Sequence, residues 1–231
     1  MEGIHISYND NIDTIKAMIE GNKDTPYEFG FFAFDVEFPP TYPHAPPLVS
    51  FINPNKNVRY HPNLYRCGKV CLSLLGTWAG PQWTSCQTLK SVLLSLQSIM
   101  DEHPMRNEPS FETLKATSSV NIHYNMIVTY HSLLSGCIGQ TIDPCCKDFS
   151  EIIMDKFQKT KPLILEKINT LKQHNGALYK SRIYGMSLKF DTDKLLHLLE
   201  PPTMSAVATN SKMNSTNSTK STKSSIEHES L

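Results

Sequence analysis

The sequence predicts an α+β fold in which a meander of short antiparallel strands packs on one amphipathic helix. Large apolar side chains alternate with smaller or charged ones over Phe32–Phe38, and this period of two indicates a strand with one buried face. From Leu89 to Met100 apolar residues instead recur at helical spacing, which indicates a helix with one apolar side. The proline-rich stretch 39–47 lacks the backbone donors that a sheet interior needs, so it must connect two strands.

Local signals predict the bounds of the neighbouring elements. Two further strands are expected at Thr14–Ile19 and Leu48–Ile52, on either side of the alternating segment. Thr84 and Gln87 have the spacing of a capping box, so the central helix is expected to span Ser85–Glu102 with its apolar face on the sheet. Pro104 is expected to end it, because proline cannot continue the hydrogen-bond ladder of a helix.

The region after Glu112 is predicted to be helical. Apolar spacing indicates four helices, with Pro162 interrupting or ending the second: 120–134, 149–157, 163–171 and 195–199. This periodicity favours a packed helical extension over residues 116–199. Residues 200–231 are rich in Ser, Thr, Asn and Lys, and so few large apolar side chains cannot offset the ordering entropy, which predicts a disordered tail.

Composition excludes several kinds of partner. The chain carries 22 basic and 22 acidic residues, a balance that gives no bulk attraction to nucleic acid or to an anionic membrane. No apolar run approaches the ~20 residues that span a bilayer, and the N-terminus lacks the basic start and apolar stretch of a signal peptide. We therefore expect a cytoplasmic or nuclear protein whose six cysteines are reduced.

The most informative segment for chemistry is Tyr60–Trp78, which reads YHPNLYRCGKVCLSLLGTW. It places Asn63 eight residues before Cys71 in a turn-rich stretch between two apolar runs. A nucleophilic cysteine needs a nearby donor to stabilise the oxyanion of its acyl chemistry, and the Asn63 amide is a candidate for that donor. The alternative is that Cys71 is a small buried apolar residue and that Asn63 only fixes a turn.

This segment resembles the active-site region of ubiquitin-conjugating enzymes, in which a His-Pro-Asn tripeptide precedes a catalytic cysteine by eight residues. Three more segments resemble that family in order and spacing: TPYEFGFF at 25–32, FPPTYPHAPP at 38–47 and Asn-Glu-Pro at 107–109. The resemblance covers residues 4–115 and is strongest to the larger members with C-terminal helical extensions. It implies the ubiquitin-conjugating fold, a four-stranded antiparallel meander packed on a central helix.

The resemblance also implies a function. Cys71 would accept ubiquitin, or a ubiquitin-like modifier, as a thioester from an activating enzyme and pass it to a lysine of a target protein, usually with a ligase. No cofactor is expected, because ATP is used by the upstream activating enzyme. The alternative is a catalytically inactive binding module of the same fold that holds ubiquitin or a ligase. A cysteine hydrolase would need an oriented histidine base, which no motif supports.

Supporting roles follow from the same resemblance. Asn63 would hold the active-site loop or donate to the oxyanion, whereas His61 is expected to be a structural hydrogen-bonding residue. Glu108 would orient or help deprotonate the incoming lysine, with a solvated loop carboxylate as the alternative. Tyr65 is expected to line the same cleft. Cys67 and Cys71 with His61 lack a fourth ligand for zinc, so no metal is expected.

The chain departs from the family pattern in three places. Residues 1–7 are too short for the N-terminal helix that family members carry, so either the extension substitutes for it or binding of the activating enzyme is altered or lost. The segment Gly76–Gly80 is an insertion that would shape the rim of the cleft, ahead of a core Trp83. The ligase-binding loops carry unusual residues, namely His44, Ser85 and Cys86. A chain cut after Lys115 is expected to fold but to be charged poorly.

Overall fold

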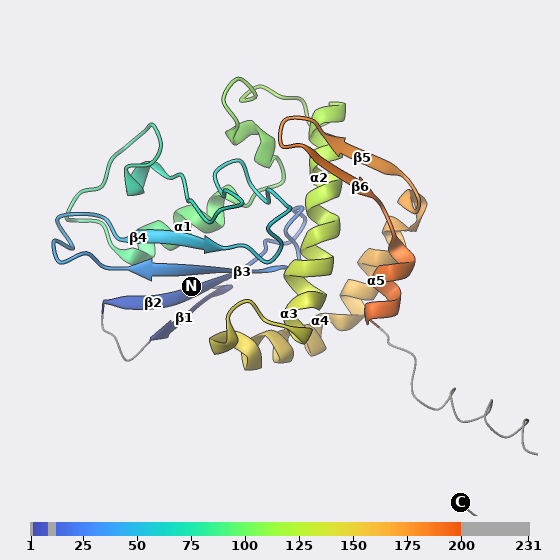
Figure 1. Cartoon of the computed structure of the whole chain (residues 1–231), viewed down its shortest axis with the longest axis horizontal. Coiled ribbons are helices and arrows are strands. Elements are labelled where there is room, and N and C mark those ends of the chain that lie inside the picture. The colour runs from blue at the N-terminus through green and yellow to red at the C-terminus, as the bar shows by residue number, and fades with distance from the viewer. Residues whose placement is uncertain (1, 9–12, 200–231) are drawn as a thin grey trace, which may run out of the picture. The chain divides into compact units, whose positions relative to one another are not determined.

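The computed structural model describes residues 2–8 and 13–199 of the 231-residue chain (Figure 1). Within this described part, four strands pair antiparallel in chain order to form one sheet: β1 Ile4–Tyr8, β2 Thr14–Glu20, β3 Phe31–Glu37 and β4 Leu48–Ile52. The predicted four-stranded meander is confirmed, and the strands expected at 14–19 and 48–52 differ by at most one residue. The predicted disordered tail, 200–231, lies outside the described residues.

The central helix, α1 (Leu89–Ile99), packs on one face of this sheet. Val92 and Leu96 of the helix are fully buried in the same hydrophobic cluster as Phe32 and Phe34 of β3. The predicted packing of a central helix on the meander is therefore confirmed.

The start of α1 differs from the prediction of Ser85–Glu102. Gln87 Oε1 does accept a hydrogen bond from the Thr84 N–H at 3.0 Å, but this bond closes a turn outside the helix. The helix begins after Thr88, which forms the capping box with Ser91. Two cap signals lie four residues apart in the sequence, and the second of them starts the helix.

The end of α1 also precedes the predicted end. The helix stops at Ile99, and Asp101 Oδ1 then accepts a hydrogen bond from the His103 N–H at 2.7 Å in the turn that follows. Pro104 is the first residue of a short 3-10 helix, η2 (Pro104–Asn107), so the expectation that it ends α1 was wrong. Proline fits there because the first helical turn leaves its N–H groups unbonded in any case.

The extension contains longer helices than predicted. Its helical elements are α2 Ser119–His131, the π-helical η3 Ser132–Ile138, α3 Gly139–Ile142, η4 Lys147–Phe149, α4 Ser150–Thr170, η5 Leu171–His174 and α5 Thr192–Leu199. Helix α4 runs through Pro162, so the helices expected at 149–157 and 163–171 are one. An internal proline costs about 3 kcal/mol. Burial of Phe157 before it and Ile164 after it offsets that cost, at roughly 1.5–3 kcal/mol for each side chain.

The extension is not purely helical, which corrects the prediction. Strands β5 (Leu178–Ser181) and β6 (Met186–Lys189) form an antiparallel hairpin. Buried and exposed residues alternate in both strands, and Gly185 takes a left-handed φ of 59° at the end of the connecting turn. A period of two over only four residues was too short to stand out beside the helical pattern on either side.

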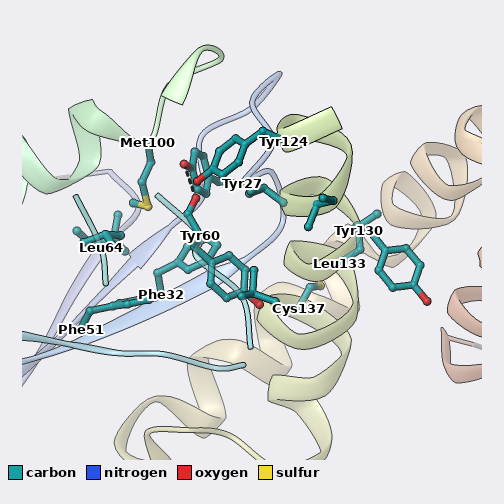
Figure 2. Packing of buried hydrophobic residues seen from close by; sticks show 14 of the residues in the cluster. Tyr27, Phe32, Phe51, Tyr60, Leu64, Met100, Tyr124, Tyr130, Leu133 and Cys137 are labelled. Atoms are coloured by element: carbon teal, nitrogen blue, oxygen red, sulfur yellow. Dashed lines mark hydrogen bonds between the residues drawn. The ribbon is translucent and has the colours of Figure 1, made fainter. Parts of the chain in front are cut away.

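The extension shares its core with the sheet. Residues 1–199 form one compact unit, and one hydrophobic cluster contains Tyr124, Leu133 and Cys137 of the extension together with Phe32 and Tyr60 (Figure 2). A chain cut after Lys115 would leave the apolar groups of its own core exposed. The expectation that such a chain folds is therefore not supported by this packing.

A second, smaller cluster covers the opposite face of the sheet. Phe31 and Ala33 of β3 are buried there against Phe149 and Ile153 of the extension. The first half of β3 is thus buried on both faces, whereas the alternating pattern predicted one buried face. From the sequence, the small side chain of Ala33 was assigned to the exposed face of the strand, but the extension buries it.

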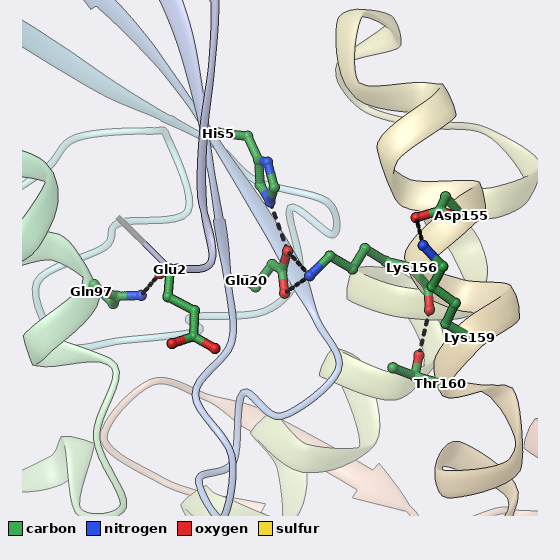
Figure 3. A network of polar contacts seen from close by, with 8 residues as sticks. All are labelled: Glu2, His5, Glu20, Gln97, Asp155, Lys156, Lys159 and Thr160. Atoms are coloured by element: carbon green, nitrogen blue, oxygen red, sulfur yellow. Dashed lines mark hydrogen bonds and ion pairs between the residues drawn. The ribbon is translucent and has the colours of Figure 1, made fainter.

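Ion pairs also connect the extension to the sheet. Lys156 of α4 lies 3.2 Å from Glu20 of β2, and His5 of β1 lies 2.7 Å from the same carboxylate (Figure 3). Lys167 of α4 lies 2.7 Å from Glu28, which is in the loop between β2 and β3. Because these pairs are partly exposed, each contributes at most about 1 kcal/mol, and the apolar clusters hold the extension in place.

Candidate active site

The structure brings Asn63 and Cys71 into direct contact. Both residues lie in the segment between β4 and the 3-10 helix η1 (Ser73–Leu75). The Cys71 N–H donates to the Asn63 backbone oxygen at 2.9 Å, and Asn63 Nδ2 donates to the Cys71 backbone oxygen at 2.8 Å. The eight-residue spacing therefore closes a loop whose two ends are held together by a reciprocal pair of hydrogen bonds.

The thiol and the amide are both covered. Cys71 keeps 2 % of its surface exposed and Asn63 keeps 3 %. One N–H of the Asn63 amide is used on the Cys71 carbonyl, which fits the loop-holding role that the sequence predicts. Asn63 Oδ1 is buried and accepts no hydrogen bond from the residues that the structure describes.

His61 is a structural residue in this arrangement. It is completely buried, and its Nδ1 accepts a hydrogen bond from the Asn63 N–H at 2.9 Å. Burial lowers the pKa of His61 to about 3, and the positive charge of Arg59 adds to this effect, although the backbone of Ile99 opposes it in part. The ring is therefore neutral near pH 7, and it is too weak a base to carry the proton transfers of catalysis.

Arg59 holds the His-Pro-Asn segment, and sequence reasoning missed it. Its Nε donates to the His61 oxygen at 3.1 Å and its Nη2 to the Pro62 oxygen at 2.5 Å. Its guanidinium carbon lies 3.3 Å from the centre of the Tyr65 ring, a cation–π contact. Tyr65, which we expected in the cleft, therefore supports Arg59. No local sequence pattern predicts this role for an arginine. The one available signal was its position two residues before His61.

The hairpin tip, residues 182–185, contacts the active-site segment. Arg66 Nη2 donates to the Tyr184 backbone oxygen at 2.5 Å. The Tyr184 hydroxyl donates to Glu108 Oε2 at 2.5 Å. Glu108, for which a solvated loop carboxylate was the alternative, is thus bound by a side chain of the extension. Sequence reasoning missed Tyr184 because 76 residues separate it from Glu108.

The inserted loop Gly76–Gly80 is fastened beside Cys71. Thr77 Oγ1 donates to the Val70 oxygen at 2.9 Å and accepts from the Leu72 N–H at 3.0 Å. These two partners flank Cys71 in the chain. Residues 76–80 are exposed to solvent, and their expected role as the rim of a cleft stays a prediction.

The two loops expected to bind a ligase lie together. His44 Nδ1 is 3.3 Å from Ser85 Oγ, and the Trp83 indole N–H donates to the Pro43 oxygen at 2.8 Å. His44, Ser85 and Cys86 are all exposed, so they form a continuous accessible edge. Trp83, expected in the core, is half-buried and packs against the main hydrophobic cluster.

Residues 2–8 and 13–199 contain neither a metal-binding cluster nor a helix that could span a membrane. In this part of the chain no three residues of the types His, Cys, Asp and Glu gather closely enough to hold a metal ion. Cys67 is exposed, whereas Cys71 is buried. None of the helices described above combines the length and the apolar character needed to cross a bilayer.

Comparisons with known proteins agree with the resemblance seen in the sequence. The family model described as "Ubiquitin-conjugating enzyme" matches residues 1–129. The chain is 44 % identical over 144 residues to "Ubiquitin-conjugating enzyme E2 Z" of Xenopus tropicalis, covering 62 % of this chain and 46 % of that protein. It is 54 % identical over 106 residues to the protein of the same name from Homo sapiens, covering 45 % and 30 %.

A third relative covers more of the chain. "Probable ubiquitin-conjugating enzyme protein 17" of Caenorhabditis elegans is 37 % identical over 201 residues, which cover 83 % of this chain and 26 % of that protein. The similarity to this relative therefore reaches beyond the 129 residues of the family model. The chain spans less than half the length of each of these three relatives.

Proposed function

This chain belongs to the ubiquitin-conjugating enzyme family, and from that premise we propose that it carries ubiquitin, or a ubiquitin-like modifier, as a thioester on Cys71. The reciprocal pair of hydrogen bonds between Asn63 and Cys71 is the observation that carries the proposal. It fixes the backbone on which the nucleophile sits and places a side-chain amide beside it.

In the charging step, the Cys71 sulfur attacks the thioester that links the modifier to an activating enzyme. A new carbon–sulfur bond forms, the old one breaks, and the thiol of the activating enzyme leaves. The bond exchange needs no cofactor in this chain. Because Cys71 is 2 % exposed, the groups that cover it must shift to admit the modifier.

In the transfer step, a lysine amine of a target attacks the carbonyl carbon of the thioester. The carbon–nitrogen bond forms, an oxyanion develops, and the Cys71 thiolate leaves as the amine loses its proton. The second N–H of the Asn63 amide is available to the oxyanion, since only one N–H is used on the Cys71 carbonyl. Glu108 orients the amine, and its carboxylate favours the cationic character that nitrogen acquires during attack.

The partners follow from this cycle. They are ubiquitin or a relative, an activating enzyme, a lysine-bearing target and a ligase that docks on the edge formed by His44, Ser85 and Cys86. We place the reaction in the cytoplasm, the nucleus or both. The alternative, an inactive module that only binds ubiquitin or a ligase, is favoured by one observation, the covered state of Cys71.

A charging assay distinguishes an active conjugating enzyme from an inactive binding module. The full chain is incubated with ATP, an activating enzyme and a modifier, with several enzyme–modifier pairs in parallel, and the products are resolved without reductant. We expect an adduct that thiol reductants remove. Cys71→Ser should give a reductant-resistant ester or no adduct, whereas Cys67→Ser, which changes an exposed thiol in the same segment, should charge normally. An adduct that persists in Cys71→Ala and disappears in Cys67→Ser would rule out the assignment.

A further inference from the structure

The hairpin tip, residues 182–185, is anchored to the active-site segment at several points. Arg66, five residues before Cys71, donates to the Tyr184 backbone oxygen at 2.5 Å. The Arg59 N–H contacts the sulfur of Met186, the first residue of β6, at 3.2 Å. The tip is therefore held against the segment that carries the nucleophile, although more than 100 residues separate the two in the chain.

Tyr184 is fixed in this tip by contacts on its ring as well as on its backbone. Its ring centre lies 5.7 Å from that of Tyr124 in α2 and 5.2 Å from the Arg59 guanidinium carbon. Burial raises the pKa of Tyr184, and the hydrogen bond to Glu108 and its negative charge raise it further, against a smaller lowering by Arg59. The hydroxyl therefore stays protonated, and it remains a donor under all ordinary conditions.

The Glu108 carboxylate is held by one of its two oxygens. The Tyr184 hydroxyl donates to Oε2 at 2.5 Å, a short, charge-assisted bond. Oε1 receives no hydrogen bond from any residue within 2–8 and 13–199. A carboxylate restrained at Oε2 keeps Oε1 in a constant place, whereas a free glutamate on a loop samples several rotamers.

We propose that Tyr184 is a positioning residue that holds Glu108 so that Oε1 receives the incoming lysine amine. The tip of the β5–β6 hairpin is then the acceptor side of the active site. This inference rests on the proposed function, since it concerns the step in which the Cys71 thioester is attacked by an amine. It assigns to the extension a part in the lysine transfer, separate from any part in binding the activating enzyme.

The chain offers a matched pair of variants to test this role. Tyr184→Phe removes the hydroxyl bound to Glu108 and keeps the ring that packs on Tyr124. Tyr179→Phe removes a hydroxyl from β5 of the same hairpin, where it contacts His174 Nδ1 at 2.6 Å and has no contact with Glu108. The full chain is charged, ATP is removed, and the decay of the thioester is followed over a series of free-lysine concentrations.

We expect Tyr184→Phe to slow discharge about 10-fold at low lysine, the low end of the range for losing a hydrogen bond to a charged group. The loss should appear as a higher half-saturating lysine concentration, with a smaller change in the maximal rate. The slowing of lysine discharge should also exceed any slowing of the charging step. Tyr179→Phe should discharge like the unaltered chain. In a Glu108→Gln background Tyr184→Phe should add little, because the group that it positions is already altered.

The outcomes separate this inference from the proposed function. If the unaltered chain forms no thioester with any activating enzyme and modifier, the proposed function fails and this role fails with it. If the unaltered chain charges but Tyr184→Phe discharges at the same lysine dependence, only the role of Tyr184 is refuted. A full effect of Tyr184→Phe in the Glu108→Gln background, or an equal slowing of charging and discharge, would show that the tyrosine is merely structural.

Discussion

His61 should make the folded protein sensitive to mild acid. In the unfolded chain its pKa is near the ordinary 6.5, whereas burial and the charge of Arg59 lower the pKa in the folded protein to about 3. Between these two values the unfolded chain binds a proton that the folded protein excludes. The free energy of unfolding therefore falls as the pH drops below 6.5, by about 1.4 kcal/mol for each pH unit. At pH 5 the loss from His61 is about 2 kcal/mol.

A second histidine acts in the same direction. Burial and the charge of Lys194 lower the pKa of His131 to about 4, so at pH 5 this residue contributes a further loss of about 2 kcal/mol. Together the two histidines should reduce the free energy of unfolding by about 4 kcal/mol between pH 7 and pH 5, a large fraction of the 5–15 kcal/mol that is typical of a folded protein. Carboxylates also titrate in this window, so the histidine part must be isolated with variants.

Urea unfolding of the full chain at pH 7 and pH 5 measures this loss. In His61→Asn the new side-chain oxygen can still accept the Asn63 N–H, but it does not titrate. We expect that variant to lose about 2 kcal/mol less than the unaltered chain between the two pH values, and His61→Asn with His131→Gln to lose about 4 kcal/mol less. An unchanged pH dependence in His61→Asn would refute the idea that the buried ring is held neutral.

Two further perturbations test the site and the shared core. Asn63→Ala should slow lysine discharge roughly 100-fold, the effect of losing an oxyanion donor worth about 3 kcal/mol, and should slow charging far less. Equal losses in a paired charging and discharge assay would leave Asn63 with the loop-holding role alone. Truncation after Lys115 should give an unfolded chain, because it removes Tyr124, Val128 and Leu133 from the main hydrophobic cluster. A cooperative melting transition of the truncated chain in circular dichroism would contradict that view of the core.

The parts of the fold that depend on local signals could be predicted from the sequence. Strands β2 and β4 were placed within one residue, and for β4 the prolines on either side, Pro47 and Pro54, limit the strand. The pairing of Asn63 with Cys71 was predictable for the same reason, since an eight-residue loop closes locally. Where two local signals competed, as at Thr84 and Thr88, the sequence did not show which of them begins the helix.

The parts that depend on distant contacts could not be predicted in this way. Helix α4 passes through Pro162 because the extension packs along its whole length, and nothing near the proline announces that packing. Tyr184 and Met186 contact Arg66 and Arg59 through folds of the chain that bring residues more than 100 positions apart together.

Hydrogen bonds through Arg59 couple the extension to the His-Pro-Asn segment. The Tyr124 hydroxyl donates to the Arg59 backbone oxygen at 2.9 Å, and the Arg59 side chain holds the oxygens of His61 and Pro62. Substitutions in α2 or in the hairpin can therefore displace the backbone beside Cys71 without touching the nucleophile. The family model ends at residue 129, inside α2, so it includes Tyr124 but not the hairpin that carries Tyr184. We therefore expect assays of the proposed charging and discharge to require a protein that retains residues up to 199.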